Sequence, residues 1–228
     1  MKAIHKILLI ATAILLMSGC TALERRDYES RIAEVSEVYP TEKVSDLFKK
    51  FPNGFDISHE KVEVLEDGKT FFHKLELAGE PESKVVSGYY IKMASDYKKL
   101  LTVPVIYDDV NGLIAQEDYQ FEPAMQDFAF LFQKVNLGKE EMGKMNFKDV
   151  SSNPVLGTYS IRYEITNLSL NHYLGLPDET QLVIDFGGDK FSKEIGDFRI
   201  DIWITQGLKT YVEEMVSENL KKGEDDDN

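Results

Sequence analysis

The single cysteine of this 228-residue chain, Cys20, follows a segment whose residue types suit export and cleavage. Lys2 and Lys6 give the first residues a positive charge, residues 7–17 are apolar, and Ser18 and Gly19 are the small residues that a signal peptidase requires. This order is typical of a secretory signal peptide and predicts that residues 1–19 are removed. The apolar run is too short for a transmembrane helix, which needs about 20 residues to cross about 30 Å of hydrocarbon.

Cys20 itself stands at the predicted cleavage site. The segment from Leu15 to Cys20 resembles the bacterial lipobox, although Met17 occupies a position where leucine is commoner. The resemblance implies that the Cys20 thiol takes a diacylglyceryl group and that Cys20 becomes the new N-terminus. Diacylglyceryl and acyl chains, such as palmitate, would then anchor the protein stably to the outside of the cell membrane. The alternative is a soluble secreted protein in which Cys20 has no role.

Lipidation would leave the mature chain without a thiol, which excludes disulfides, thiolate metal sites and cysteine nucleophiles. Its three histidines, His59, His73 and His172, form no His-Glu-x-x-His or His-x-His pair. A zinc site built from such scattered residues requires tertiary contacts. We therefore expect these histidines at surface or hairpin positions.

Other chemical motifs are incomplete. Ser192-Lys193 lacks the context of a nucleophilic serine site, and residues 187–190 are too short to cradle a phosphate. Asp108 and Asp109 lie in a predicted turn but lack the alternate ligands and the closing glutamate of a calcium loop. The sequence therefore predicts no catalytic, cofactor-binding or metal-binding residue, and no enzyme activity.

The charge balance narrows the class of partner. The chain has a net charge of −14, which becomes −16 when Lys2 and Lys6 leave with the signal peptide. General nucleic-acid binding is excluded because it needs a basic surface. An acidic body is also repelled by an anionic membrane, so the lipid alone would hold it there. The hydrophobic content of 43% and the aromatic content of 11% favour a packed globule over a disordered chain.

The spacing of apolar residues predicts three helical segments. Residues 21–38 carry a thin helical stripe, and Thr41 is a suitable N-cap for a helix that ends at Pro52-Asn53-Gly54. A clearer amphipathic helix is expected from Pro123 to Val135.

Alternating runs predict strands elsewhere. Asp67-Gly68 separates two of them and is a strong hairpin signal. Pro104 favours an edge position or a bulge for its strand. Residues 136–154 are expected to be loop, and 208–220 fit either a helix or the second arm of a hairpin. The expected strands cover 62–65, 70–77, 84–93, 100–107, 113–115, 157–165, 181–186 and 198–204.

Together these elements predict an α+β fold, a mostly antiparallel sheet of hairpins with about three packed helices. The expected organisation is a signal peptide (1–19), an anchor and N-terminal helical segment (20–40), one globular α+β domain (41–220) and an acidic tail (221–228).

Two pairs of adjacent aromatic residues raise the question of whether other elements cover both faces of the predicted sheet. Phe71-Phe72 and Tyr89-Tyr90 would each place one ring on either face of a strand. Either both faces of the sheet are covered, or one face carries an exposed aromatic patch of the kind that marks interaction sites.

Three stretches, read in order behind the lipobox, carry a family resemblance. They are Tyr39-Pro40-Thr41 with Asp46-Leu47, then Ser152-Asn153-Pro154 leading into Tyr159–Ile165 and Asn167, and then Leu176-Pro177, Gly188-Asp189 and Gly196-Asp197-Phe198. Over roughly residues 30–206 the chain resembles the tandem lipoproteins of staphylococci, also called the Csa or lipoprotein-like family.

The resemblance implies an antigenic surface lipoprotein without known enzymatic activity. It also implies signalling to innate receptors of the host through the lipid and, in some members, adhesion to or entry into host cells. Members are often lysine-rich, so the acidity of this chain is a departure that disfavours interactions through a basic surface. The family's strand-like C-terminal segment favours the hairpin for residues 208–217.

The sequence thus favours a lipid-anchored, non-enzymatic surface lipoprotein that binds a protein or polymer outside the cell. The alternative is a cell-envelope enzyme or accessory factor whose site is assembled from scattered Asp, Glu and His residues. A third candidate is a transporter-linked solute receptor, for which the 209 residues left after removal of residues 1–19 are few for two lobes.

Overall fold

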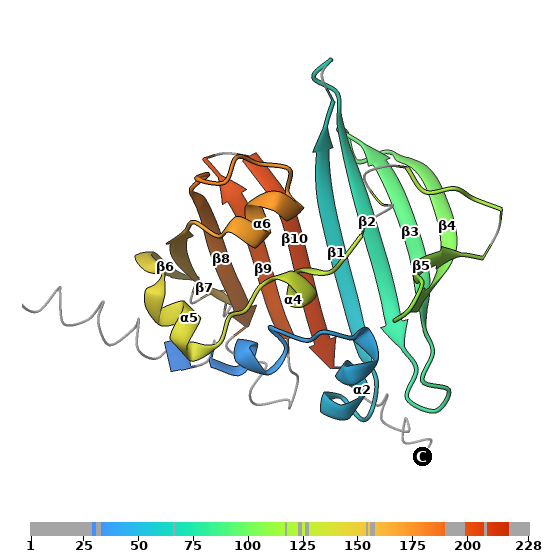
Figure 1. The fold of residues 1–228 in the computed structure, drawn as a ribbon, viewed down its shortest axis with the longest axis horizontal. Helices are drawn as coiled ribbons and strands as arrows, with labels where there is room; N and C mark the ends of the chain where they lie inside the picture. Colours follow the sequence, from blue (N-terminus) through green and yellow to red (C-terminus); the bar gives the residue numbers. More distant parts are fainter. Residues whose placement is uncertain are drawn as a thin grey trace, which may run out of the picture.

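The strands form one ten-stranded antiparallel sheet in the order β5-β4-β3-β2-β1-β10-β9-β8-β7-β6 (Figure 1). No described helix is long and apolar enough to span a membrane. The predicted signal peptide, Cys20 and the acidic tail lie outside the described residues. The computed structural model describes residues 29–30, 33–65, 67–116, 118–122, 125, 128–153, 155, 158–189, 199–207 and 209–218.

The strands are β1 (Phe55–Val64), β2 (Thr70–Gly79), β3 (Val86–Ala94), β4 (Lys99–Asp108), β5 (Gly112–Ala115), β6 (Asn146–Asn153), β7 (Thr158–Ile165), β8 (Leu182–Asp189), β9 (Arg199–Gln206) and β10 (Lys209–Glu218). The short helices are η1 (Ala33–Glu37), η2 (Val44–Asp46), α2 (Leu47–Lys50), α4 (Leu131–Lys134), α5 (Lys139–Lys144) and α6 (Leu168–Tyr173).

Glycines with positive φ turn the chain between consecutive strands. Gly68 has φ +81° between β1 and β2, and Gly207 has φ +61° between β9 and β10. Glycine adopts these angles readily because it lacks a Cβ atom. The hairpin predicted at Asp67-Gly68 is therefore confirmed. The segment that fitted either a helix or a strand forms β10, which pairs with β9.

The first and last strands of the described chain meet at the centre of the sheet. β1 pairs with β10 from Phe55 opposite Glu218 to Lys61 opposite Val212. β1 to β5 lie on one side of this junction and β6 to β10 on the other. Pairing between β1 and β10 therefore joins the two halves of the sheet.

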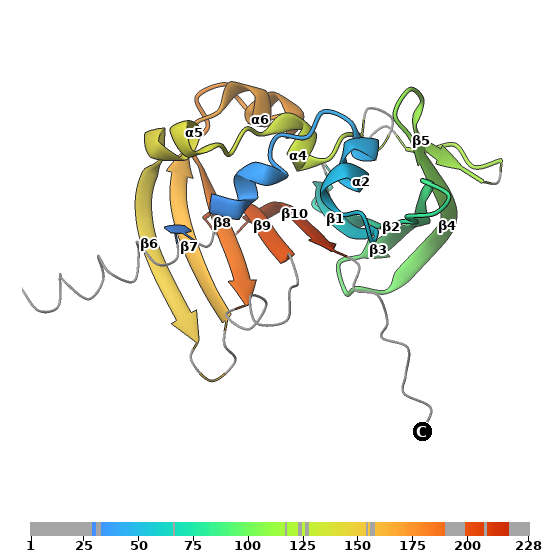
Figure 2. The same ribbon diagram turned by 90° about the horizontal axis from the view of Figure 1, so that it is seen from below.

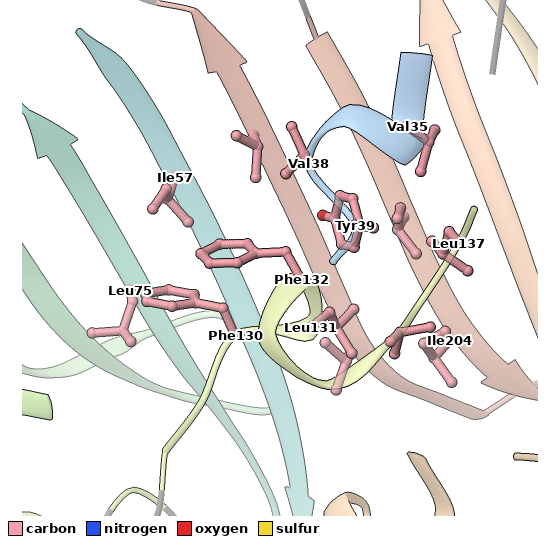
Figure 3. Close-up of a cluster of buried hydrophobic side chains, with 14 of the residues drawn as sticks. Val35, Val38, Tyr39, Ile57, Leu75, Phe130, Leu131, Phe132, Leu137 and Ile204 are labelled. Carbon is pink, nitrogen blue, oxygen red and sulfur yellow. The ribbon is translucent and has the colours of Figure 1, made fainter. Parts of the chain in front are cut away.

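All the described helices lie on one face of the sheet, called here the inner face (Figure 2). The strands alternate accordingly: on β7, Ile161 and Tyr163 are buried on the inner face. The segments before α2 and around α4 pack their apolar side chains against the inner face of the sheet and form the core with it. Figure 3 shows this packing, with Val35, Val38, Tyr39, Phe130, Leu131, Phe132 and Leu137 over Ile57, Leu75 and Ile204.

The antiparallel sheet agrees with the predicted hairpins, but the helices are few and short, so the fold is mostly β. The helix predicted from Pro123 to Val135 is wrong for residues 128–130, because α4 begins only at Leu131. Its start is set by tertiary contacts, since a buried carboxylate accepts the first two N–H groups of α4.

The loop predicted over residues 136–154 is also wrong, because this segment contains α5 and β6. β6 is an edge strand whose side chains are mostly exposed. Such a strand needs no apolar alternation, which removes the signal that revealed the other strands.

Two further predictions need correction. The helix expected after Thr41 is broken into η2 and α2, and the Thr41 hydroxyl donates to the Val38 carbonyl instead of capping it. β4 is not an edge strand, because it lies between β3 and β5, and the irregularity in its pairing with β3 lies opposite Lys92 and Met93, away from Pro104. β5 pairs only with residues 105–108, so Pro104 lies beside the end of that pairing.

Candidate functional site

The face of the sheet opposite the helices, called here the outer face, carries no described helix (Figure 2). On β8 and β9 the alternation that turns Ile184 and Ile202 inward turns Asp185, Asp201 and Trp203 outward. Trp203 lies directly opposite Asp185 in the register. This part of the outer face therefore combines an indole ring with carboxylates.

A groove of about 530 Å³ crosses β6 to β9 on this face. Besides Trp203, Asp185 and Asp201, its lining is rich in hydroxyl and amide side chains. These are Ser151, Ser152, Asn153, Thr158, Ser160 and Thr205. Short polar side chains of this kind donate and accept hydrogen bonds.

Trp203 occupies space that a side chain at position 187 would take. A Cβ atom built on Gly187 would lie 2.4 Å from the Trp203 Cζ3 atom. The indole therefore lies against the bare backbone of β8, where it forms part of the lining of the groove.

Within the described part of the chain, only one of the two carboxylate oxygens of Asp185 is paired with a cation. Its Oδ2 atom accepts a hydrogen bond from Arg162 Nε at 2.6 Å. Its Oδ1 atom is buried and has no hydrogen-bond partner among the described residues. Buried polar atoms in native proteins are nearly always satisfied, so this oxygen is a candidate acceptor for a ligand hydroxyl or amine.

A second groove of about 500 Å³ adjoins the first on the outer face of β10, β1, β2 and β3. One row of directly paired residues connects the grooves: Gly187, Asp201, Met215, Ser58, Glu76 and Tyr89. Five strand spacings separate the ends of this row, which is roughly 24 Å at the usual spacing between strands.

The aromatic pair at Tyr89-Tyr90 divides between the two faces as predicted. Tyr90 is fully buried, whereas Tyr89 is 51% exposed and lines the second groove. The outer face therefore carries Trp203 in one groove and Tyr89 in the other. No described helix covers this face, and the two rings lie in separate grooves.

A buried carboxylate on the inner face organises the elements that cover it. Glu214 is fully buried and accepts four hydrogen bonds. The donors are Tyr39 Oη (3.0 Å), His59 Nδ1 (2.6 Å), Leu131 N (2.7 Å) and Phe132 N (3.0 Å). Burial and the adjacent Glu214 carboxylate raise the pKa of Tyr39, so its hydroxyl remains a donor.

His59 and His73 lie on the two strands of the β1–β2 hairpin, but both are fully buried, so the expectation is wrong as to a surface position. His59 lies directly opposite Glu214 across β1 and β10, with its Nε2 atom 3.3 Å from the Tyr173 hydroxyl. The rings of Phe128 and Phe130 pack edge-on against its imidazole. This closed, fully buried environment is that of a structural network.

His73 lies in a second polar cluster, at the end of the β1–β2 hairpin. Its Nδ1 atom is 2.8 Å from the Tyr90 hydroxyl, and its Nε2 atom is 3.0 Å from Glu63 Oε2. Glu122 lies alongside, with its Oε2 atom 2.6 Å from Lys92 Nζ. Glu63, His73 and Glu122 are the described residues whose spacing suits a metal ion.

The remaining sequence candidates do not join these clusters. His172 is exposed on α6 and pairs with Asp178. Asp108 Oδ1 accepts hydrogen bonds from the backbone of Val110 and Asn111 in its own turn. Gly187 to Asp189 belong to β8, and Ser192-Lys193 lie outside the described residues.

Sequence reasoning missed the groove residues, Glu214 and the partners of His73. Alternation on the strand predicted at 198–204 places Asp201 and Trp203 on one face, which was an available signal. No local pattern marks Glu63, Glu122 or Glu214 among the 40 acidic residues.

No protein-family model matches the chain. A comparison with curated proteins also finds no match.

Proposed function

We propose that this protein is a lipid-anchored surface lipoprotein, held by Cys20 at the outside of the cell membrane, that acts by binding and not by catalysis. The ligand is a hydroxyl-rich polymer, a glycan, that lies across the outer face of the sheet. The observation that carries the proposal is the Trp203 indole against Gly187, in a groove lined by hydroxyl, amide and carboxylate groups. The anchor rests on the lipobox-like sequence.

The chemistry of the groove suits sugars. A sugar ring presents C–H groups that stack on an aromatic face, while its hydroxyls bond to carboxylates and amides. Ligand sites generally combine aromatic side chains with a few placed polar groups in this way. Asp185 Oδ1 supplies a buried acceptor. The roughly 24 Å between Gly187 and Tyr89 would accommodate several consecutive sugar units.

The charge of the outer face selects among glycans. Asp185 and Asp201 line the first groove, and Glu60 lies opposite Glu213 on the neighbouring strands β1 and β10. With a net charge of −14 for the whole chain, an anionic polysaccharide would be repelled. The favoured ligands are neutral glycans and glycans that carry amino groups.

Calorimetric titration of the full chain with soluble oligosaccharides tests this proposal. We expect binding of chitin or chitosan oligosaccharides, which are neutral and cationic, and no binding of anionic heparin fragments. Trp203→Ala should weaken binding about tenfold or more, which is about 1.4 kcal/mol, because the stacking surface is lost. Gly187→Ala should act similarly, since its Cβ atom displaces the indole.

Tyr97→Ala is the matched control, because Tyr97 is an aromatic residue, 65% exposed, that lies outside both grooves. Its affinity should equal that of the unchanged chain. Absence of binding to every oligosaccharide, or equal affinities for the Trp203→Ala and Tyr97→Ala variants, would refute the proposal.

One observation favours the alternative of a cell-envelope enzyme: Asp185 and Asp201 line the same groove. A pair of carboxylates is the usual machinery of glycoside hydrolysis. Release of new reducing ends from the bound oligosaccharide, abolished by Asp201→Asn, would support the enzyme. Binding without release supports the binding protein.

A further inference from the structure

The polar cluster around His73 lies on the inner face, away from both grooves. On the β1–β2 hairpin, His73 pairs with Lys61 and Glu63 pairs with Phe71, so Glu63 and His73 are diagonal neighbours. Glu122 reaches them from the segment that follows β5. One potential ligand atom from each of Glu63, His73 and Glu122 lies within 4.8 Å of the other two.

These donors suit a divalent transition metal. One imidazole nitrogen and two carboxylate oxygens give three ligands, the number that an open zinc site takes from a protein. His73 is fully buried, whereas the side chains of Glu63 and Glu122 are 29% and 35% exposed. An ion can therefore enter from solvent and keep a water molecule as its fourth ligand.

The surroundings of His73 favour ligation through Nε2. Tyr90 is fully buried, and its hydroxyl lies 2.8 Å from His73 Nδ1. A partner on the distal nitrogen is typical of metal-binding histidines, because it fixes the tautomer and the ring orientation. The Nε2 atom then faces Glu63 Oε2 at 3.0 Å. Two acceptor atoms this close require a positive centre between them, either a proton or a metal ion.

Lys92 competes with a metal ion for the same carboxylate. Its Nζ atom lies 2.6 Å from Glu122 Oε2 and 4.3 Å from the centre of the Phe71 ring. Metal binding through Glu122 Oε2 would break this ion pair, and binding through either carboxylate oxygen places a second cation near the first. We propose that Glu63, His73 and Glu122 form a site for a zinc-class divalent ion, and that Lys92 lowers its affinity.

Calorimetric titration of the full chain with zinc chloride at about pH 7 tests this inference. The chain should carry Cys20→Ala throughout, so that no thiol competes for zinc. We expect one saturable site that persists in excess calcium. Cobalt(II) bound there should show the absorption bands of a nitrogen- and oxygen-ligated ion, since the three donors supply no sulfur.

Variants separate this site from general binding to acidic groups. His73→Gln and Glu122→Gln should each weaken zinc binding about tenfold or more. Lys92→Met should strengthen it about fivefold, because a partly exposed ion pair no longer has to break. His172→Gln is the control, since His172 pairs with Asp178 on the exposed side of α6, and its affinity should not change.

Glu122 is partly exposed, so the Glu122→Gln variant keeps the test decisive even if His73→Gln unfolds the chain. Failure of zinc to bind at a single saturable site would overturn the inference. The same holds if Glu122→Gln binds zinc as well as His172→Gln does, or if excess calcium removes the zinc. None of these outcomes depends on glycan binding.

Discussion

Glu60 and Glu213 lie directly opposite each other on β1 and β10, on the outer face of the sheet. Like charges at paired positions destabilise a sheet. Partial burial and then repulsion from Glu213 raise the pKa of Glu60, while Lys74 opposes this effect from β2. The strands that join the two halves of the sheet thus carry a local electrostatic strain at neutral pH.

At the residue scale, this pair predicts how stability depends on pH. Because the pKa of Glu60 is higher in the folded chain than its ordinary value of 4.5, the folded state holds more protons between these two values. Stability therefore falls as the pH rises through this window. Glu60→Gln should raise the urea midpoint at about pH 7 and have little effect at about pH 4.

Glu82→Gln is the control for this prediction, because Glu82 is exposed in the turn between β2 and β3. Its urea midpoint should shift little at either pH. A Glu60→Gln variant that is less stable at neutral pH, or whose effect is the same at both values, would contradict the argument.

At the scale of elements, Glu214 connects the sheet to its cover. Its carboxylate accepts hydrogen bonds from β1 through His59, from the segment before α2 through Tyr39, and from the start of α4. His59 extends the connection to α6 through Tyr173. Burial, followed by the charge of Glu214, raises the pKa of Tyr173, so its hydroxyl stays protonated.

Removing Glu214 should therefore loosen several elements at once. Glu214→Ala leaves the buried His59, Tyr39 and two backbone N–H groups without their acceptor, at a cost of about 3–5 kcal/mol in the free energy of unfolding. Urea denaturation measures this loss. Glu218→Ala, at a half-buried position on the same strand, should cost far less. A loss below about 1 kcal/mol for Glu214→Ala would show that the network contributes little.

At the scale of the whole molecule, a short stretch of sequence joins the proposed anchor to the first described residues. Glu29 Oε1 accepts a hydrogen bond from the Tyr163 hydroxyl on β7 at 2.9 Å. Only residues 21–28 separate Glu29 from Cys20, and a chain of this length reaches at most about 30 Å. If Cys20 is lipidated, β7 and the groove beside it work near the membrane.

Cys20→Ala tests the anchor. We expect the variant to remain unprocessed or to be released into the medium, and to lose incorporation of labelled palmitate, because no thiol accepts the lipid. Thr21→Ala, one residue further along, should stay in the membrane fraction and keep the label. A processed Cys20→Ala form that is retained in the membrane would remove the lipidation proposal.

Local patterns in the sequence were sufficient for most of the sheet. Asp67-Gly68 marked a hairpin, and alternation marked β7, because both signals arise from residues adjacent in the chain. They failed for β6, an exposed edge strand, and for the start of α4. In both places the conformation depends on a partner elsewhere, on β7 and on Glu214.

The candidate site residues show the same difference between local signals and contacts made by distant parts of the chain. The acidity and the hairpins can be read from the sequence, because net charge is additive and turns depend on neighbouring residues, and the predicted anchor rests on a local motif in the same way. His59 meets Glu214 across 155 positions, and Trp203 covers Gly187 on another strand. Those contacts depend on strand order and register, which bring distant residues to the same face. The burial of two histidines and the groove beside Trp203 therefore became visible only in the folded chain.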